Sequence, residues 1–431
     1  LQPTFAIESL MDICSEKLGI DPIELRMING MKDGAVTHTR QVLGKVAYTE
    51  TLKKCSEIAG WEVGPSRVRG PVRKDIKGSQ IAEPYIPGKE FKSEEAMKLC
   101  RDRFKYGRGV GTGWYGIGRC ATIDKAGAFV EIDDGGTAMI LTGVSEIGEG
   151  ILTVLTQIAA DELGMYPEDI TIGDNDTARA PEAAHVGASR QTYMIGNAVC
   201  NACRDVKKKF IREMAAYWNI DSSSICMKNR RIYVEGNAQY NLSLKEAVDI
   251  CKKIRGIVPL GSGTYTAHHE GLDPVDGRGN PWQAYVFGTQ IAEVAVDTFT
   301  GEVHVLGIWA AHDVGRVINP RGVEGQIEGG SVQSMGQTIM ENYVLSEGIP
   351  ANKNFAKYIL PTSVDVPEIH SYLVEERDPF SPVGAKGIGE PAPLPTAPAI
   401  VNAIYDAVGV RITSLPAIPE KILNEMSKMK N

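Results

Sequence analysis

The order of helical and extended segments constrains the fold of this chain more than any other feature. Residues 151–163 and 191–217 repeat apolar side chains at the period of a helix, and a further helix is expected to start near Glu324. Residues 282–297 and 302–311 instead alternate like two paired strands. Helices and strand pairs follow one another without the regular strand–helix alternation of a parallel sheet. We therefore predict an α+β fold.

The composition divides the chain into regions. Apolar residues at the helical period predict a helix over 4–18, Asp21 and Pro22 are typical of the start of a second helix, and a third covers about 49–59. Residues 63–105 then hold four prolines and many charges with little periodicity. That composition is typical of a linker.

Residues 106–431 are predicted to form the main domain, with two α+β lobes at about 106–255 and 256–431. Early in this region, residues 127–133 and 137–142 alternate in the manner of strands and are joined by an Asp-Gly-Gly turn. They predict a β-hairpin.

Charge and hydropathy narrow the class of partner. The 431 residues carry a net charge of −8 and a pI of about 5.6. Nucleic-acid binding needs clustered Lys and Arg, so we expect no nucleic-acid partner. No apolar run approaches the roughly 18 residues of a membrane helix, so no membrane partner is expected either. The opening Leu1-Gln2-Pro3 lacks the features of a signal peptide and is typical of the interior of a larger protein or of a processed terminus.

The eight cysteines are too sparse for a disulfide scaffold, which predicts reduced thiols and a cytoplasmic location. Only Cys200 and Cys203 lie close together, in an apolar helical stretch where core packing is favoured over a metal. No cysteine spacing matches the ligands of a [2Fe–2S] cluster, and no two histidines share a helix face. We therefore expect no metal held by protein side chains.

Four glycine-rich stretches are predicted to form turns that lead into helices. Glycine lets the backbone approach a ligand closely, and a helix start offers free N–H groups. Four such turns together indicate a long, anionic, phosphate-bearing ligand. The chain has neither a dinucleotide-binding glycine motif in a βαβ unit nor a phosphate-binding Walker loop, so plain NAD or ATP is excluded. The four stretches are 143–150, 187–192, 325–330 and 384–390.

The last stretch ends in an acidic residue, Glu390, which lies between Gly389 and Pro391 and precedes further apolar residues. Partial desolvation there would raise the pKa of the carboxyl and make it a better base. The alternative is an ordinary loop glutamate.

Residues 384–391 resemble the glutamate motif of the molybdenum hydroxylases, the family of xanthine dehydrogenases and aldehyde oxidoreductases. The similarity runs the whole length of the chain. Other segments resemble the helix that follows the family's arginine loop, its second and third cofactor turns, and its C-terminal tail. They are 5–12 with 21–26, 188–192 with 196–198, 313–320 with 325–330, and 409–421.

This resemblance implies the fold, the cofactor and the site. The fold would be a molybdopterin-binding domain of mixed sheets, with helix N-termini that meet the cofactor. The cofactor would be molybdopterin, in bacteria usually the cytosine dinucleotide, with molybdenum held by the pterin dithiolene. Glu390 would be the catalytic base. The cofactor-binding residues carried over are Gly148, Glu149, Gly150, Ala188, Ser189, Arg190, Gln191, Thr192, Gln326, Gly387 and Gly389.

The resemblance also implies partners. Residues 1–62 correspond to the helical end of the family's first molybdenum domain, and the rest of that domain is expected on another chain. The family passes two electrons through [2Fe–2S] clusters to FAD or another acceptor. This chain has neither the cluster ligands nor a flavin fold, so separate subunits are expected to carry them.

Two positions depart from the family pattern. The first cofactor turn usually reads Gly-Gln-Gly, but here it is Gly148-Glu149-Gly150. A carboxylate would repel a pyrophosphate unless it were protonated, turned away or paired with a cation. Arg119 follows Tyr115 in a strand where the family places apolar pocket residues. Either Arg119 is an exposed residue on a shifted strand, or Arg119 and Tyr115 face a substrate that carries a carboxylate or a ring carbonyl.

These observations lead to one main hypothesis. The chain is expected to be the C-terminal part of a molybdenum hydroxylase that hydroxylates an N-heteroaromatic substrate, such as a purine or pyridine carboxylate, with oxygen from water. An aldehyde oxidoreductase is the alternative. A non-catalytic assembly or cofactor-carrier subunit is the rival from another class.

Overall fold

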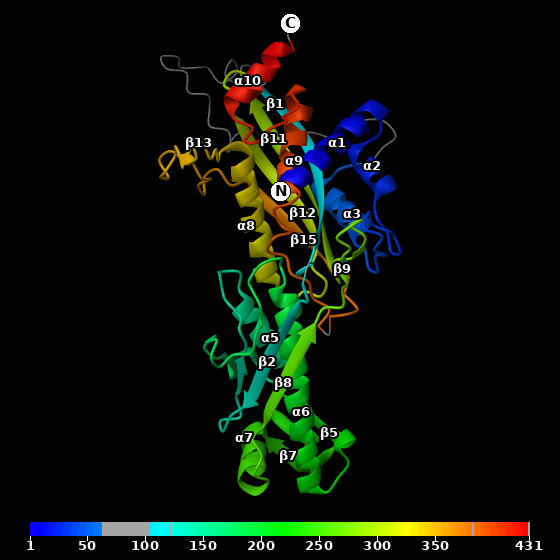
Figure 1. The fold of residues 1–431 in the computed structure, drawn as a ribbon, viewed down its shortest axis with the longest axis vertical. Helices are drawn as coiled ribbons and strands as arrows, with labels where there is room; N and C mark the ends of the chain where they lie inside the picture. The colour runs from blue at the N-terminus through cyan, green and yellow to red at the C-terminus, as the bar shows by residue number, and fades with distance from the viewer. Residues whose placement is uncertain (63–102, 121, 382, 430–431) are drawn as a thin grey trace.

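The computed structural model describes residues 1–62, 103–120, 122–381 and 383–429. The predicted linker at 63–105 therefore lies almost entirely outside the described residues. The described residues form an elongated molecule with an upper and a lower part (Figure 1), each built on its own sheet. Helices and mixed sheets together confirm the predicted α+β class.

The upper part is built on a four-stranded sheet in the order β1-β11-β12-β15. β1, β11 and β12 are antiparallel neighbours, and β15 runs parallel to β12. Every residue of β11 is buried. The strands are β1 (Phe104–Gly116), β11 (Tyr285–Asp297), β12 (Val303–Asp313) and β15 (Glu368–Val374).

Helices cover both faces of the upper sheet (Figure 1). Successive residues of β11 point to opposite faces of the sheet. Ile291 packs with Leu52 of α3, and Ala292 packs with Ile400 of α9. Close contact with α9 explains the glycines of β1, since a Cβ at Gly109 would lie 2.2 Å from the backbone N of Ala403. The helices of the upper part are α1 (Gln2–Leu18), α2 (Pro22–Asn29), α3 (Tyr48–Ala59), α8 (Pro320–Ile339), α9 (Thr396–Val408) and α10 (Pro419–Lys428).

A buried ion pair holds the N-terminal helices against the upper sheet. The Nε atom of Arg26, on α2, lies 2.9 Å from Oε2 of Glu8, on α1. Glu8 also accepts hydrogen bonds from the backbone N and the hydroxyl of Thr112, on β1, at 2.8 and 2.7 Å. Residues 1–29 are therefore fixed to β1 by a shared carboxylate.

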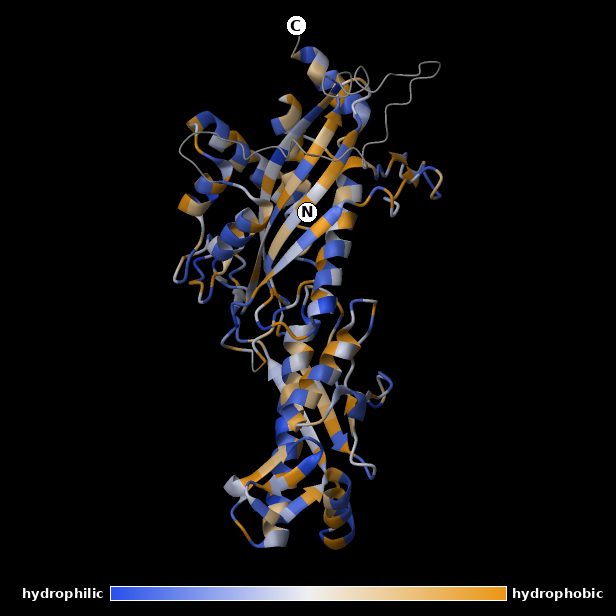
Figure 2. Cartoon of the chain, turned by 180° about the vertical axis from the view of Figure 1, so that it is seen from behind, coloured by the Kyte–Doolittle hydropathy of each residue, from blue (hydrophilic) through white to orange (hydrophobic). Residues whose placement is uncertain are grey.

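The lower part packs two helices on a second sheet in the order β4-β3-β2-β8. A small sheet of β5, β6 and β7 closes the lower end. In Figure 2 the strands of both main sheets carry orange, apolar stretches among white and blue ones. The elements are β2 (Lys125–Ile132), β3 (Ala138–Leu141), α5 (Ile151–Leu163), β4 (Ile170–Ile172), α6 (Gly196–Trp218), β5 (Ile225–Lys228), β6 (Arg231–Val234), β7 (Asn237–Ser243), α7 (Leu244–Asp249) and β8 (Leu260–Thr266).

Short elements complete the chain. A π-helical turn, Gln191–Ile195, precedes α6, and a second one, Ile250–Ile254, follows α7. Single 3-10 turns lie at Pro167–Asp169 and Ser222–Ser224. The two-residue strands are β9 (Gly271–Leu272), β10 (Gly279–Asn280), β13 (Leu345–Ser346) and β14 (Ile349–Pro350).

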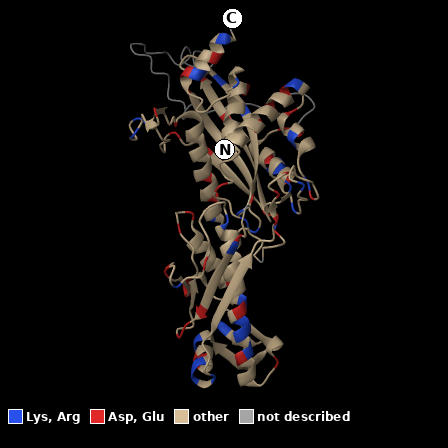
Figure 3. Cartoon of the chain, in the orientation of Figure 1, with Lys and Arg blue, Asp and Glu red and all other residues tan. Residues whose placement is uncertain are grey.

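Lys and Arg gather at the lower end of the molecule, along the C-terminal half of α6 (Figure 3). Several of them pair with acids beside them. Lys209 lies 2.7 Å from Asp205, and Arg255 lies 3.2 Å from Glu213. This end therefore mixes basic and acidic side chains, and it lies away from the junction of the two parts.

The local predictions hold better than the long-range ones. The helices at the N-terminus, at 151–163 and after 191 are confirmed, and so is the β2–β3 hairpin. The predicted turn at 325–330 is wrong, because α8 begins at Pro320 and these glycines lie inside it. The sheets also cross the predicted lobe boundary at 255, since β1 belongs to the upper sheet and β8 to the lower one.

Candidate active site

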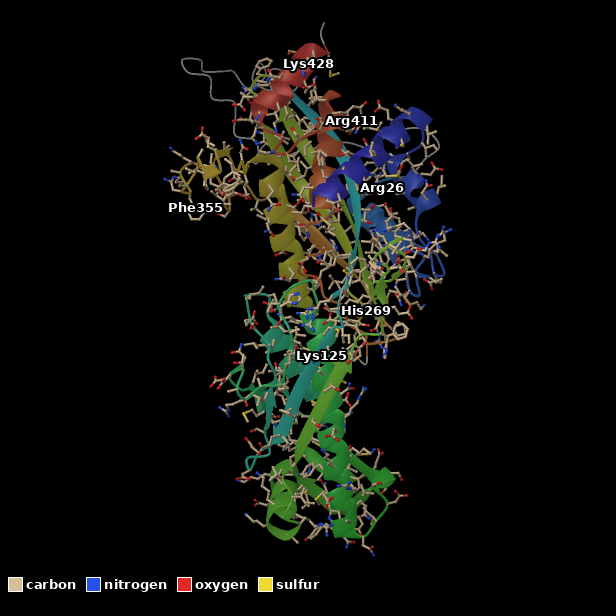
Figure 4. All side chains as sticks on the ribbon, in the orientation of Figure 1. Arg26, Lys125, His269, Phe355, Arg411 and Lys428 are labelled. Atoms are coloured by element: carbon tan, nitrogen blue, oxygen red, sulfur yellow. The ribbon has the colours of Figure 1, made fainter. Side chains whose placement is uncertain are left out.

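Residues from all four glycine-rich stretches meet where the lower part joins the upper part. Figure 4 marks this junction with Lys125, at the start of β2. The backbone O of Lys125 accepts a hydrogen bond of 2.9 Å from Arg190, in the second stretch. The starts of α5, α6 and α8 all approach the junction.

The first stretch forms a tight loop before α5. Gly148 and Gly150 have φ values of 103° and 85°, which non-glycine residues rarely adopt. The carboxylate of Glu146 accepts hydrogen bonds from the backbone N of Gly148 at 2.8 Å, Gly150 at 3.0 Å and Leu152 at 3.2 Å. Burial acts to raise the pKa of Glu146, but these backbone donors outweigh it and lower that pKa.

Glu149, the departure from the family's glutamine, points inward from the same loop. Its carboxylate accepts from the backbone N of Ile147 at 2.9 Å and from the side-chain amide of Gln191 at 2.5 Å. Burial first, and then the nearby Glu146, raise the pKa of Glu149. No cation pairs with it among the residues that the structure describes. The carboxylate of Glu149 is therefore bound by donors from its own loop and from Gln191, not by a cation.

The second and fourth stretches press directly against each other. Ala188 and Ser189 have φ values of 55° and 49°, an uncommon conformation for non-glycine residues that often marks functional sites. A Cβ at Gly387 would lie 1.9 Å from the backbone O of Ser189. Only glycine fits there, so the two turns can meet only with this residue at 387.

Arg190, one of the predicted cofactor-binding residues, directs its side chain into the protein. Its side chain is fully buried, and Nη2 lies 2.7 Å from Asp124. The remaining donors bind the backbone O atoms of Ala183, His185 and Lys125. The guanidinium therefore supports the turn from within the protein. No local pattern indicates this role, because Asp124 lies 66 residues away.

Thr192, Gln326 and Glu149 line a narrow cavity together with Gly150, which we call the cofactor cavity. α5 and α8 both begin beside it. Arg316 lies on its wall, within 3.2 Å of Asp161, and Asn319 caps α8 through its side-chain oxygen. The complete lining is Glu149, Gly150, Val154, Thr192, Val314, Arg316, Ile318, Asn319, Gly322, Val323, Gln326, Ala385, Lys386 and Ile388.

Tyr115 and Arg119 line a second, wider cavity of about 620 Å³, which we call the substrate cleft. The sequence placed both residues at a substrate pocket, and the structure brings them together with Ala188. The pKa of Tyr115 is raised, first by burial and then by the charge of Glu390 and a hydrogen bond to it. The complete lining is His38, Thr39, Trp114, Tyr115, Gly116, Gly118, Arg119, Cys120, Thr122, His185, Ala188, Trp282 and Tyr285.

Glu390 lies between the two cavities. Its Oε2 accepts a hydrogen bond of 3.2 Å from the hydroxyl of Ser189, and its backbone N donates to the same hydroxyl at 3.0 Å. Tyr115 faces it from the substrate cleft, whereas the preceding Gly389 approaches Gln326 of the cofactor cavity. The side chain is exposed, so the expected partial desolvation by the following apolar residues is wrong. Residues 391–393 are buried instead.

A buried ion pair supports the loop that carries Glu390. Nζ of Lys386 lies 2.7 Å from Oδ2 of Asp313 at the end of β12, and both side chains are almost fully buried. Burial raises the pKa of the Asp313 carboxyl, and the charge of Lys386 opposes that rise. The backbone N of Lys386 also donates to the O of Val314 at 3.0 Å. The loop is therefore fixed to the upper sheet four residues before Glu390.

Sequence reasoning missed several residues of the site. His185 lines the substrate cleft and contacts Arg119, but it is a lone histidine outside any motif. Asp313 and Asp124 support the site through ion pairs with Lys386 and Arg190, which are remote from them in the chain. The one signal for His185 in the sequence is its position just before the second glycine-rich stretch.

A family model described as the molybdopterin cofactor-binding domain matches residues 86–367. The chain belongs to this family. The match confirms the resemblance to molybdenum hydroxylases. The chain is 30% identical to a probable xanthine dehydrogenase subunit of Bacillus subtilis over 440 residues, which cover 99% of this chain and 52% of that protein. It is also 30% identical to the aldehyde oxidoreductase of Megalodesulfovibrio gigas, over 99% of this chain and 40% of that protein.

Solved structures agree with this assignment. The crystal structure of the aldehyde oxidoreductase from Desulfovibrio desulfuricans matches with a TM-score of 0.75 and 28% identity, over 98% of this chain and 40% of that one. A quinoline 2-oxidoreductase from Pseudomonas putida has the same fold, with a TM-score of 0.80 and 24% identity, over 99% of this chain and 52% of that one. The chain thus spans about half the length, or less, of the relatives it matches.

The cofactor cavity, of about 70 Å³, offers donors that suit an anionic part of the family's molybdopterin cofactor. A Cβ at Gly148 or Gly150 would meet no atom within 4 Å, so a ligand has room beside this turn, where the backbone N–H groups of both glycines donate to Glu146. Amide side chains and Arg316 supply donors for an anionic ligand. In the described part of the chain, no group of three or more His, Cys, Asp or Glu residues could hold a metal ion. No helix among the described residues has the length and hydropathy to cross a membrane.

Proposed function

We propose that this chain is the C-terminal part of the catalytic molybdopterin-binding subunit of a molybdenum hydroxylase. The substrate would be an N-heteroaromatic compound, such as a purine or a pyridine carboxylate, which is hydroxylated with oxygen from water. The observation that carries the proposal is the position of Glu390 between a cofactor cavity and a substrate cleft. An aldehyde substrate is the second candidate, favoured by the identity to the aldehyde oxidoreductase of Megalodesulfovibrio gigas.

In this proposal each part of the site has one role. The cofactor, in its cytosine dinucleotide form, would be held by Gln191, Thr192 and Gln326 and by the backbone of 148–150 and 387–389, and would supply the redox chemistry. Glu390 takes up a proton as general base. The hydroxyl of Ser189 orients the carboxylate of Glu390, and Tyr115 approaches it from the side of the substrate.

The partners follow from the length of the relatives. We propose that a chain with the first molybdenum domain completes the subunit, and that [2Fe–2S] and FAD subunits receive the electrons. One relative is named "6-hydroxypseudooxynicotine dehydrogenase complex subunit gamma", which is a subunit name of the kind that this arrangement requires. The free cysteines, seven among the described residues, support a cytoplasmic location.

The rival function is assembly or storage of the cofactor without catalysis. A carrier would need the cofactor cavity but not the base. The paired hydrogen bonds between Ser189 and Glu390, and the aromatic cleft beside them, favour catalysis over storage.

Molybdenum and pterin analysis of the purified native complex tests the proposed function. We expect molybdenum and a pterin dinucleotide with this chain, iron in other chains, and reduction of a dye with xanthine, nicotinate or benzaldehyde as the electron donor. An active preparation that contains a flavoprotein but no molybdenum would contradict the proposal. A preparation that holds molybdenum but reduces the dye with none of these donors would favour the carrier.

A further inference from the structure

The substrate cleft contains a cation without an acidic partner. Arg119 is half-buried, and no carboxylate among the described residues pairs with its guanidinium. The adjacent acid, Asp124, accepts from the backbone N of Arg119 at 3.0 Å but directs its carboxylate to the fully buried Arg190, 2.7 Å away. A half-buried guanidinium of this kind is costly unless an anion reaches it.

His185 is the group that holds this guanidinium. Nε and Nη2 of Arg119 lie 3.0 and 2.7 Å from Nδ1 of His185. A guanidinium can only donate, so Nδ1 must be the acceptor, and the imidazole is neutral with its proton on Nε2. Nη1 has no acceptor among the described residues. One edge of the guanidinium is therefore fixed by His185, and the other is available for a ligand.

Four aromatic side chains line the cleft, together with small and polar residues. The rings of Trp114 and Tyr285 are stacked with centroids 4.9 Å apart, and Trp282 meets Tyr285 edge-on at 5.9 Å. Tyr115 adds a fourth ring beside Glu390. A cleft of about 620 Å³ has the size of a small-molecule site, and its flat apolar walls suit a planar ring.

We propose that the ligand of this cleft is an aromatic ring bearing a carboxylate. Arg119 binds that carboxylate through two hydrogen bonds, and His185 is a positioning residue that keeps Arg119 turned toward the cleft. The proposal rests on the proposed function for what happens to the ring. Recognition of the carboxylate, however, can be measured without turnover.

The test compares two ligands of nearly the same shape, the anionic pyridine-3-carboxylate and the neutral pyridine-3-carboxamide. Each is titrated into the native complex, and binding is followed by quenching of the fluorescence of Trp114 and Trp282. We expect the carboxylate to bind at least about 10-fold more tightly, which corresponds to roughly 1.4 kcal/mol. Arg119→Leu should remove this preference, because it removes the positive charge that distinguishes the two ligands.

Variants of His185 separate positioning from folding. His185→Leu should weaken carboxylate binding several-fold and reduce the preference for the carboxylate over the carboxamide. His185→Asn should restore carboxylate binding, because its side-chain oxygen can replace Nδ1 as the acceptor. His38→Leu is the matched control, since His38 lines the same cleft and contacts Trp114 rather than Arg119. It should affect both ligands equally.

The outcomes distinguish this proposal from the proposed function. Equal binding of the two ligands by the wild-type complex, or an unchanged preference in Arg119→Leu, would overturn the proposal that the ligand is an aromatic carboxylate. Turnover of a neutral aldehyde in that case would leave the proposed function intact. Selective carboxylate binding that depends on Arg119, in a complex without molybdenum, would support the ligand class and contradict the proposed function.

Discussion

The two cavities beside Glu390 differ in what shapes them, which is backbone geometry for one and side chains for the other. The turns beside the cofactor cavity depend on backbone geometry, with positive φ values at Gly148 and Gly150 and a close approach of Gly387 to Ser189. The substrate cleft depends on side chains, above all the rings and the Arg119–His185 pair. A site that backbone geometry shapes suits a ligand that a whole family shares, whereas side chains can change with the substrate. Variants beside the cofactor cavity should therefore alter the cofactor content of the complex. Variants in the substrate cleft should alter only its preference among ligands.

The largest effect is expected from Lys386→Met, on the cofactor side. It leaves the carboxylate of Asp313 buried without its partner, and such a loss typically destabilises a protein by about 3–5 kcal/mol. We expect a lower melting temperature and a loss of molybdenum from the native complex. Lys45→Met is the control, because Lys45 pairs with Asp33 and Glu376 at the surface and its loss should change neither quantity. Wild-type stability and metal content in Lys386→Met would show that the pair does not support the site.

Gly387→Ala should have the next largest effect. Its Cβ would lie 1.9 Å from the backbone O of Ser189, so the two turns must separate. Overpacking of this kind typically costs about 1–3 kcal/mol, and here it should also lower the pterin content. Gly325→Ala, on the exposed side of α8 with no atom within 4 Å, should instead be neutral or stabilising by up to about 1 kcal/mol. Equal pterin content in the two variants would mean that contact between the turns is not required.

The sequence could predict the features that depend on local signals. Glycines, helix starts and helical periodicity are local signals, so the turns at 143–150, 187–192 and 384–390 can be located from the sequence alone. The turn at 325–330 is misplaced by the same reasoning, even though Asn319 and Pro320 are typical of a helix start. The glycines at 325–330 predicted a turn, whereas the capping residues before them mark the start of the helix that contains these glycines.

Long-range partners could not be predicted. The sequence pattern assigns Arg190 to the cofactor, but Asp124 and three backbone carbonyls hold it inside the protein. β1, which precedes all strands of the lower sheet in the sequence, belongs to the upper sheet, whereas β8 belongs to the lower one, and no local pattern indicates this. His185 enters the cleft only because the fold places it beside Arg119.

The smallest effect is expected from Glu149→Gln, which restores the family's usual residue. The pKa of Glu149 is raised in the folded protein, so folding favours its protonated form. Its contribution to stability is therefore present below its unfolded pKa and is lost as the pH rises through the folded value. We expect the neutral variant to be more stable than wild type at pH 7, by about 0.5–1.5 kcal/mol, and equal to it near pH 4. Thermal unfolding at both pH values measures this. A variant less stable than wild type at pH 7 would show that the carboxylate is needed.

The central claim is that Glu390 is the base between the two cavities. Its most direct test is the turnover of Glu390→Gln in the native complex, expressed per molybdenum. General-base steps typically contribute about 10²–10⁴-fold, so we predict a loss of that size with molybdenum content, pterin content and ligand binding unchanged. Glu420→Gln, an exposed glutamate on α10, should keep full activity. A Glu390→Gln complex that retains more than about a tenth of the wild-type rate would contradict the claim.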